Sequence, residues 1–109
     1  LTGMKIDINR QCFALANKTG GLSGPAIKPI AVRMVYQAAN AVSIPVIGMG
    51  GIACAEDALE FILAGASAIS IGTANFFNPY AAEETVQGIE AYMREKKVDR
   101  LTDLIGIVK

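Results

Sequence analysis

Two short apolar runs that stop at glycine constrain the fold of this chain most strongly. The first run is Val46–Gly51 and the second is Ile69–Thr73, with Gly72 placed 22 residues after Gly50. Each run is rich in β-branched residues and is followed by a helical pattern, so the pair predicts two consecutive strand–helix units. Because glycine has no Cβ, we expect these strand ends to leave N–H groups open beside helix N-termini, where phosphates bind.

Consecutive units of this kind suit part of a (β/α)8 TIM barrel, in which the usual phosphate site follows strands 7 and 8. A complete barrel takes about 250 residues, whereas this chain has 109. We therefore expect residues 1–109 to form a single partial domain, the C-terminal part of a barrel that includes strands 7 and 8. A start at Leu1 without an initiator Met supports the same expectation.

Composition narrows the classes of partner. Hydrophobic residues make up 52% of the chain, and we interpret this excess as barrel core whose neighbouring strands are missing. No apolar run approaches the 18 or more residues of a membrane span, so we expect no membrane partner. Ten basic and ten acidic residues balance to a net charge of zero, which gives no reason to expect a nucleic-acid partner.

Cysteine and histidine usage bounds the chemistry that the chain can perform. It has two cysteines, Cys12 and Cys54, and no histidine. That inventory supports neither a zinc or iron–sulfur site nor a Ser-His-Asp or Cys-His catalytic pair within one chain. We expect both cysteines to be small, semi-buried residues in a reducing cytosol.

The remaining patterns predict the other elements. Alternation and turn residues indicate strands, whereas apolar spacing of three and four residues indicates helices. In chain order we expect a β-hairpin over Met4–Ala16, an irregular glycine-rich loop over Thr19–Pro25, a helix over 28–42, a strand over Ile44–Ile47, a helix over Ala55–Ala64 stopped by Gly65, a strand over Ala68–Ile71, a helix over Tyr80–Lys96 that turns Val86, Ile89 and Met93 inward, and a terminal amphipathic turn with Leu101, Leu104 and Ile105.

Several of these residues could have purely structural roles instead of binding a ligand. Gly50, Gly51 and Gly72 could be ordinary turn glycines, and Ser23 and Thr73 could be helix caps. Charged residues of the first long helix, Lys28 and Arg33, are expected to be solvated. Gly88 is expected to be tolerated inside the last helix, at a cost of about 1 kcal/mol relative to alanine.

Strand–helix order alone would also allow a flavodoxin-like layer or half of a Rossmann fold. Four segments narrow the choice, because their order and spacing match a known family: Gly20–Pro29, Ile47–Ile52, Gly65–Ala68 and Gly72–Phe76. They resemble the C-terminal third of dihydroorotate dehydrogenase, class 1B, the NAD-linked catalytic subunit. The resemblance covers nearly the whole chain.

This resemblance implies a barrel that carries FMN and oxidises dihydroorotate to orotate in de novo pyrimidine (UMP) biosynthesis. By matching position, Gly24 would contact FMN, and Gly50, Gly51, Gly72 and Thr73 would hold its phosphate. The family's catalytic base is a cysteine in the first half of the barrel, so no catalytic residue is expected here and neither Cys12 nor Cys54 inherits that role. On its own, the 109-residue chain is expected to be inactive.

The same resemblance implies a cytoplasmic flavoprotein and an electron-transfer subunit that carries FAD and a [2Fe–2S] cluster and passes electrons to NAD. One alternative is a flavin domain similar to that of dihydropyrimidine dehydrogenase, although Pro25 and Gly72–Phe76 favour the dihydroorotate branch. Another is a non-catalytic fragment that associates with itself, because buried strands without neighbours leave edge groups unpaired. We therefore also expect a homo-oligomer.

Overall fold

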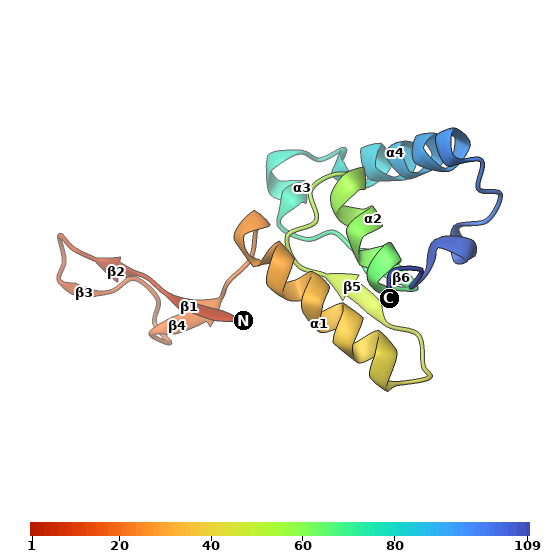
Figure 1. The fold of residues 1–109 in the computed structure, drawn as a ribbon. Coiled ribbons are helices and arrows are strands. Elements are labelled where there is room, and N and C mark those ends of the chain that lie inside the picture. The colour runs from red at the N-terminus through yellow and green to blue at the C-terminus, as the bar shows by residue number, and fades with distance from the viewer.

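A computed structural model describes all residues from 1 to 109 and shows a mixed α/β arrangement (Figure 1). In chain order its elements are β1 (Thr2–Met4), β2 (Ile6–Asp7), β3 (Cys12–Phe13), β4 (Thr19–Gly21), the 3-10 helix η1 (Pro25–Ile27), α1 (Lys28–Ala41), β5 (Ile47–Met49), α2 (Ala55–Ala64), β6 (Ala68–Ser70), α3 (Ala74–Phe77), α4 (Ala81–Lys96) and the 3-10 helix η2 (Leu101–Leu104). None of its helices is both long enough and apolar enough to cross a membrane.

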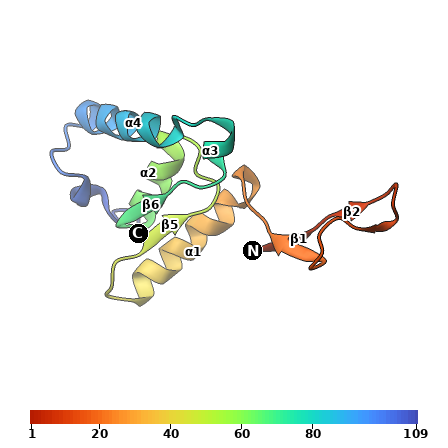
Figure 2. The ribbon, with the colours of Figure 1, turned by 180° about the vertical axis from the view of Figure 1, so that it is seen from behind.

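The first 21 residues form a two-stranded arm that projects away from the helices (Figures 1 and 2). At its base β1 pairs antiparallel with β4, and towards its tip β2 pairs antiparallel with β3. The tip turns because Asp7 Oδ1 accepts the N–H groups of Asn9 and Arg10, each at 3.0 Å. The predicted hairpin is therefore confirmed. The irregular loop was predicted to start at Thr19, but Thr19–Gly21 form a strand because they pair with β1.

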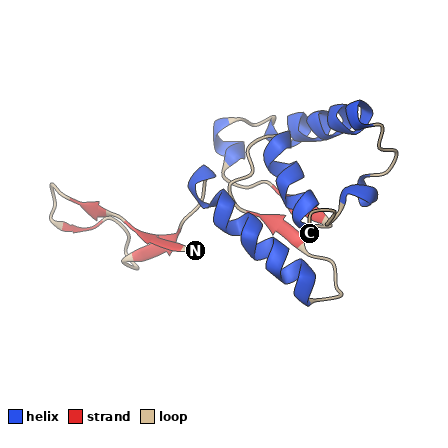
Figure 3. Ribbon diagram, viewed as in Figure 1, coloured by secondary structure: helices blue, strands red, loops and turns tan.

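Helices α1 and α2 pack on one face of a parallel pair of strands, β5 and β6 (Figure 3). In this pair Ile47 lies opposite Ala68. Strand β5 starts three residues later than predicted, because only Ile47–Met49 lie opposite the short strand β6 and can pair with it. Residues on the uncovered face stay accessible: Ile47 and Met49 are each 59% exposed. The expectation of strands buried on both faces is therefore not met in this structure, because helices pack on one face only.

Helix α2 is the centre of the core, and it packs against α1, α4 and both strands of the parallel pair. Its residues Ala58 and Phe61 are fully buried, and the ring of Phe61 lies directly against the bare backbone of Gly48 in β5. The predicted bounds of α2 are confirmed. Gly65, at a φ of 123°, ends the helix by donating its N–H to carbonyls of the last turn, as a C-terminal glycine does.

Two features of the last third differ from the sequence-based expectation. A short helix, α3, follows β6, although no separate element was predicted there. Val86 was predicted to face inward but is 56% exposed, whereas Ile89 is buried as predicted. The reason is that α4 packs on α2 and leaves the side beside β6 uncovered, where Val86 lies. Leu104 of η2 joins the core, as expected for the terminal amphipathic turn.

Gly88 has a packing role that the sequence pattern did not reveal. A Cβ built on Gly88 would lie only 2.4 Å from the Cβ of Ala55, at the start of α2. Two heavy atoms cannot approach so closely, so α4 would have to move away from α2. Gly88 is therefore required where these helices cross, rather than only tolerated.

We expect Gly88→Ala to lower the free energy of unfolding by about 1–3 kcal/mol, the usual cost of overpacking. This loss should appear even though alanine favours helix over glycine by about 1 kcal/mol. Urea unfolding measures the change, with Gln87→Ala as the control because Gln87 is an exposed neighbour on the same helix. A variant of Gly88 that gains stability would show that the two helices do not make this contact.

Candidate functional site

A cavity of about 340 Å³ opens where β5 and β6 end. Four stretches of the chain form its wall, namely 23–25, 49–53, 70 with 72–74, and 77–78, and no ionisable side chain lies among the lining residues. All five residues singled out from the sequence line it: Gly24, Gly50, Gly51, Gly72 and Thr73. The two glycine-bearing turns therefore meet at the same end of the parallel pair, as expected for neighbouring parallel strands.

Backbone N–H groups supply the polar character of this wall. No group of the chain accepts a hydrogen bond from the N–H groups of Gly50, Gly51, Gly72 or Thr73. Helix α2, ten residues long, begins a few residues beyond the first turn and adds the positive end of its dipole. A neutral wall with unpaired N–H donors suits an anionic group that is bound through the backbone.

The four glycines differ in what an added Cβ would meet. A Cβ on Gly24 or Gly72 would meet no atom within 4 Å, so these two present bare backbone to open space. A Cβ on Gly51 would instead lie 2.8 Å from the carbonyl oxygen of Gly24, and one on Gly50 would lie 3.0 Å from Ile27. The missing Cβ atoms of Gly50 and Gly51 therefore let the turn pack against residues 24–31, while the N–H groups of both residues stay unpaired.

Side chains of the β6–α3 turn complete the site. Thr73 is the residue before α3, yet its side chain makes no capping hydrogen bond, and Ser23 caps no helix either. The simple capping role considered for both is therefore wrong. Asn75 was missed by the sequence analysis, although it shapes this turn: its amide donates to the carbonyls of Ile71 at 2.9 Å and Gly72 at 3.1 Å.

Comparison with known proteins places these observations in a family. The sequence model of the dihydroorotate dehydrogenase family matches residues 1–93. The chain belongs to the dihydroorotate dehydrogenase family. All five residues singled out from the sequence lie inside the matched range.

Individual relatives cover the whole chain. It is 68% identical over all 109 residues to the catalytic subunit of dihydroorotate dehydrogenase B (NAD(+)) from Lachnoclostridium phytofermentans, and 58% identical over 109 residues to that from Trichlorobacter lovleyi. It is 58% identical over 106 residues, 97% of this chain, to the subunit from Alkaliphilus oremlandii. The chain spans 36% of the length of the first two relatives and 35% of the third.

Behind the cavity wall lies a cluster of charges that sequence analysis did not find. Lys28 Nζ lies 2.6 Å from Asp57 Oδ1 and 2.6 Å from Glu60 Oε1. The prediction that Lys28 is solvated is therefore wrong, whereas Arg33 is bonded only to the side chain of Gln37, at an exposed position. No local pattern could reveal the cluster, because Lys28 and Asp57 are 29 residues apart.

Hydrogen bonding favours the charged forms of Lys28 and Asp57. Burial acts to raise the pKa of Asp57, but the hydrogen bonds from Lys28 and from the N–H of Ala53 outweigh burial and lower that pKa. The hydrogen bonds to Asp57 and Glu60 raise the pKa of Lys28. None of the three side chains lines the cavity, so the ammonium group of Lys28 is neutralised by its two carboxylate partners behind the cavity wall.

The cysteines differ from the semi-buried residues that were expected, because both are exposed. Cys12 lies in β3 of the arm, and Cys54 precedes α2 near the cavity. Although Cys54 as a residue is exposed, partial desolvation of its thiol is the main cause that raises the pKa of Cys54, and this works against ionisation of the thiol.

Proposed function

We propose that this chain forms part of an FMN site in an NAD-linked dihydroorotate dehydrogenase that oxidises dihydroorotate to orotate in de novo pyrimidine (UMP) biosynthesis. The observation that carries the proposal is the cavity, where Gly24, Gly50, Gly51, Gly72 and Thr73 meet although the sequence separates them by up to 49 positions. The family match and the named relatives support the same activity.

The wall fits the phosphate end of FMN. The N–H groups of Gly50, Gly51, Gly72 and Thr73 would donate to the phosphate oxygens, and the Thr73 hydroxyl is not engaged in capping. Gly24 and Gly72 leave open space where a Cβ would otherwise project. When bound, the flavin supplies the hydride acceptor, and the residues of this chain bind and orient it.

The proposal also explains why one face of β5 is exposed in this chain. In the complete enzyme, β5 and β6 would be strands 7 and 8 of a (β/α)8 barrel, and Ile47 and Met49 would face its packed interior. The base would come from an earlier part of the barrel, because no residue at this cavity wall is ionisable. Electrons would pass to a cytoplasmic partner subunit with FAD and a [2Fe–2S] cluster, consistent with relatives named as catalytic subunits.

A chimera tests the function directly. Residues 1–109 replace the matching segment of the Lachnoclostridium phytofermentans catalytic subunit, to which they are 68% identical. With the electron-transfer subunit present, the purified chimera should contain FMN and form orotate from dihydroorotate with reduction of NAD. A folded chimera without flavin, or with flavin but active on dihydrouracil in place of dihydroorotate, would contradict the proposal. The latter result would favour the dihydropyrimidine dehydrogenase alternative, which the named relatives do not favour.

Self-association of the isolated chain is the second candidate, favoured by its uncovered parallel pair. Because Ile47 and Met49 are exposed beside unpaired strand edges, we expect the 109-residue chain to sediment as dimers or larger species at micromolar concentration. Met49→Lys and Ile47→Lys on the exposed face should shift the distribution towards monomer. A monodisperse monomer with a cooperative melt would contradict this prediction.

A further inference from the structure

We infer that Lys28 and Asp57 are positioning residues that hold the turn over residues 50–53 in its phosphate-binding form, and that Lys28 is not itself a phosphate ligand. This inference rests on the proposed function of the cavity. It goes beyond that function because neither side chain lines the cavity, and both would act through the backbone of the turn.

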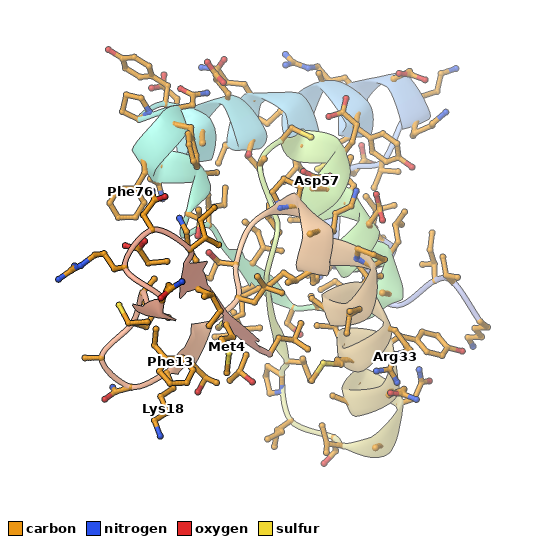
Figure 4. The ribbon with its side chains drawn as sticks, turned by 90° about the vertical axis from the view of Figure 1, so that its left-hand side faces the viewer. Met4, Phe13, Lys18, Arg33, Asp57 and Phe76 are labelled. Atoms are coloured by element: carbon orange, nitrogen blue, oxygen red, sulfur yellow. The ribbon has the colours of Figure 1, made fainter.

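The contacts form a closed ring behind the turn. Lys28 Nζ lies 2.6 Å from Asp57 Oδ1, and the other oxygen of Asp57 accepts the N–H of Ala53 at 2.9 Å. The ring closes at Gly51, whose backbone packs so tightly on the start of α1 that a Cβ on Gly51 would lie 3.0 Å from the backbone nitrogen of Lys28. Figure 4 shows Asp57 at the start of α2, close to the first turn of α1. The turn is therefore clamped from the starts of both helices.

Charge balance argues against a direct role for the ammonium group. Two carboxylates lie within 2.6 Å of Lys28 Nζ, so its charge is already neutralised. The Lys28 and Asp57 side chains are 25% and 15% exposed, which shields their interaction from solvent and salt. A phosphate at the cavity wall would therefore be held by N–H groups, whose direction depends on the turn.

The sign of one substitution separates the two roles. If charge acts directly on the ligand, Asp57→Asn removes a nearby negative charge and strengthens FMN binding. If the clamp positions the turn, Asp57→Asn replaces a charge-assisted hydrogen bond by a weaker one, loosens the turn and weakens FMN binding. Riboflavin, which lacks the phosphate, provides the internal reference, because damage to the rest of the fold affects both flavins alike.

The experiment measures dissociation constants for FMN and riboflavin in the chimeric catalytic subunit. Asp57→Asn and Lys28→Met should each reduce the preference for FMN over riboflavin about tenfold, which corresponds to the loss of one strong hydrogen bond. Lys28→Arg should retain most of the preference, because guanidinium can bridge both carboxylates. Glu60→Gln should have a smaller effect, since the Glu60 side chain is 49% exposed and Lys28 is its only polar partner.

Arg33→Met is the matched control, because Arg33 is a basic residue further along α1 with no carboxylate partner (Figure 4). An unchanged FMN preference in Asp57→Asn and Lys28→Met, or tighter FMN binding in Asp57→Asn, would overturn the positioning role. A chimera that binds no flavin before any substitution would instead overturn the proposed function. The two failures are therefore distinguishable.

Discussion

Phe61→Ala is expected to lower the free energy of unfolding by about 3–5 kcal/mol, as large-to-small substitutions of buried aromatic residues do. Phe61 is fully buried at the centre of α2, and its ring is the main contact of the bare Gly48 backbone in β5. Removing the ring would leave a cavity between the helices and the parallel pair. Urea unfolding followed by circular dichroism measures the change.

Phe76→Ala makes the same chemical change at an exposed position and serves as the control. Phe76 is 89% exposed on α3 (Figure 4), so its loss should change stability by no more than about 0.5 kcal/mol. Similar losses in both variants would show that α2 is not the centre of the core.

Gly72→Val is expected to weaken FMN binding by the chimeric catalytic subunit at least about tenfold. A Cβ on Gly72 meets no protein atom within 4 Å, so valine fits the free protein but projects into the space that the ligand would occupy. The loss should therefore appear in flavin content and dissociation constant, with little change in the melting temperature.

Gly21→Val is the matched control for this experiment. A Cβ on Gly21 also meets nothing within 4 Å, but Gly21 lies in β4 of the arm and does not line the cavity. Its variant should retain flavin. Equal flavin content in the two valine variants would remove Gly72 from the proposed site. Gly51→Val is less informative, because its side chain would collide with Gly24 and Lys28 rather than with a ligand.

Local sequence signals predicted the helices well. The bounds of α2 are those expected from its apolar spacing and the stop at Gly65, and α1 differs from its predicted range by one residue. Strands were predicted less accurately, since β5 is displaced by three residues and β4 was taken for loop. Helices close their hydrogen bonds within a segment, whereas the extent of a strand depends on its partner.

The sequence alone determined the family and which residues meet at the cavity. Glycines at the ends of two parallel strands must lie at one edge of the sheet, and that geometry needs no knowledge of packing. Their resemblance to dihydroorotate dehydrogenase agrees with the family match over residues 1–93.

Only the tertiary structure decided what supports that cavity. Lys28 and Asp57 are 29 residues apart, and nothing in the pattern of either helix links one to the other. Gly51 and Gly88 likewise have their roles set by atoms of other elements, Gly24 and Ala55. The physical reason is that such contacts depend on how closely two helices approach. That distance is fixed by packing of the whole core, and no repeating pattern in the sequence reports it.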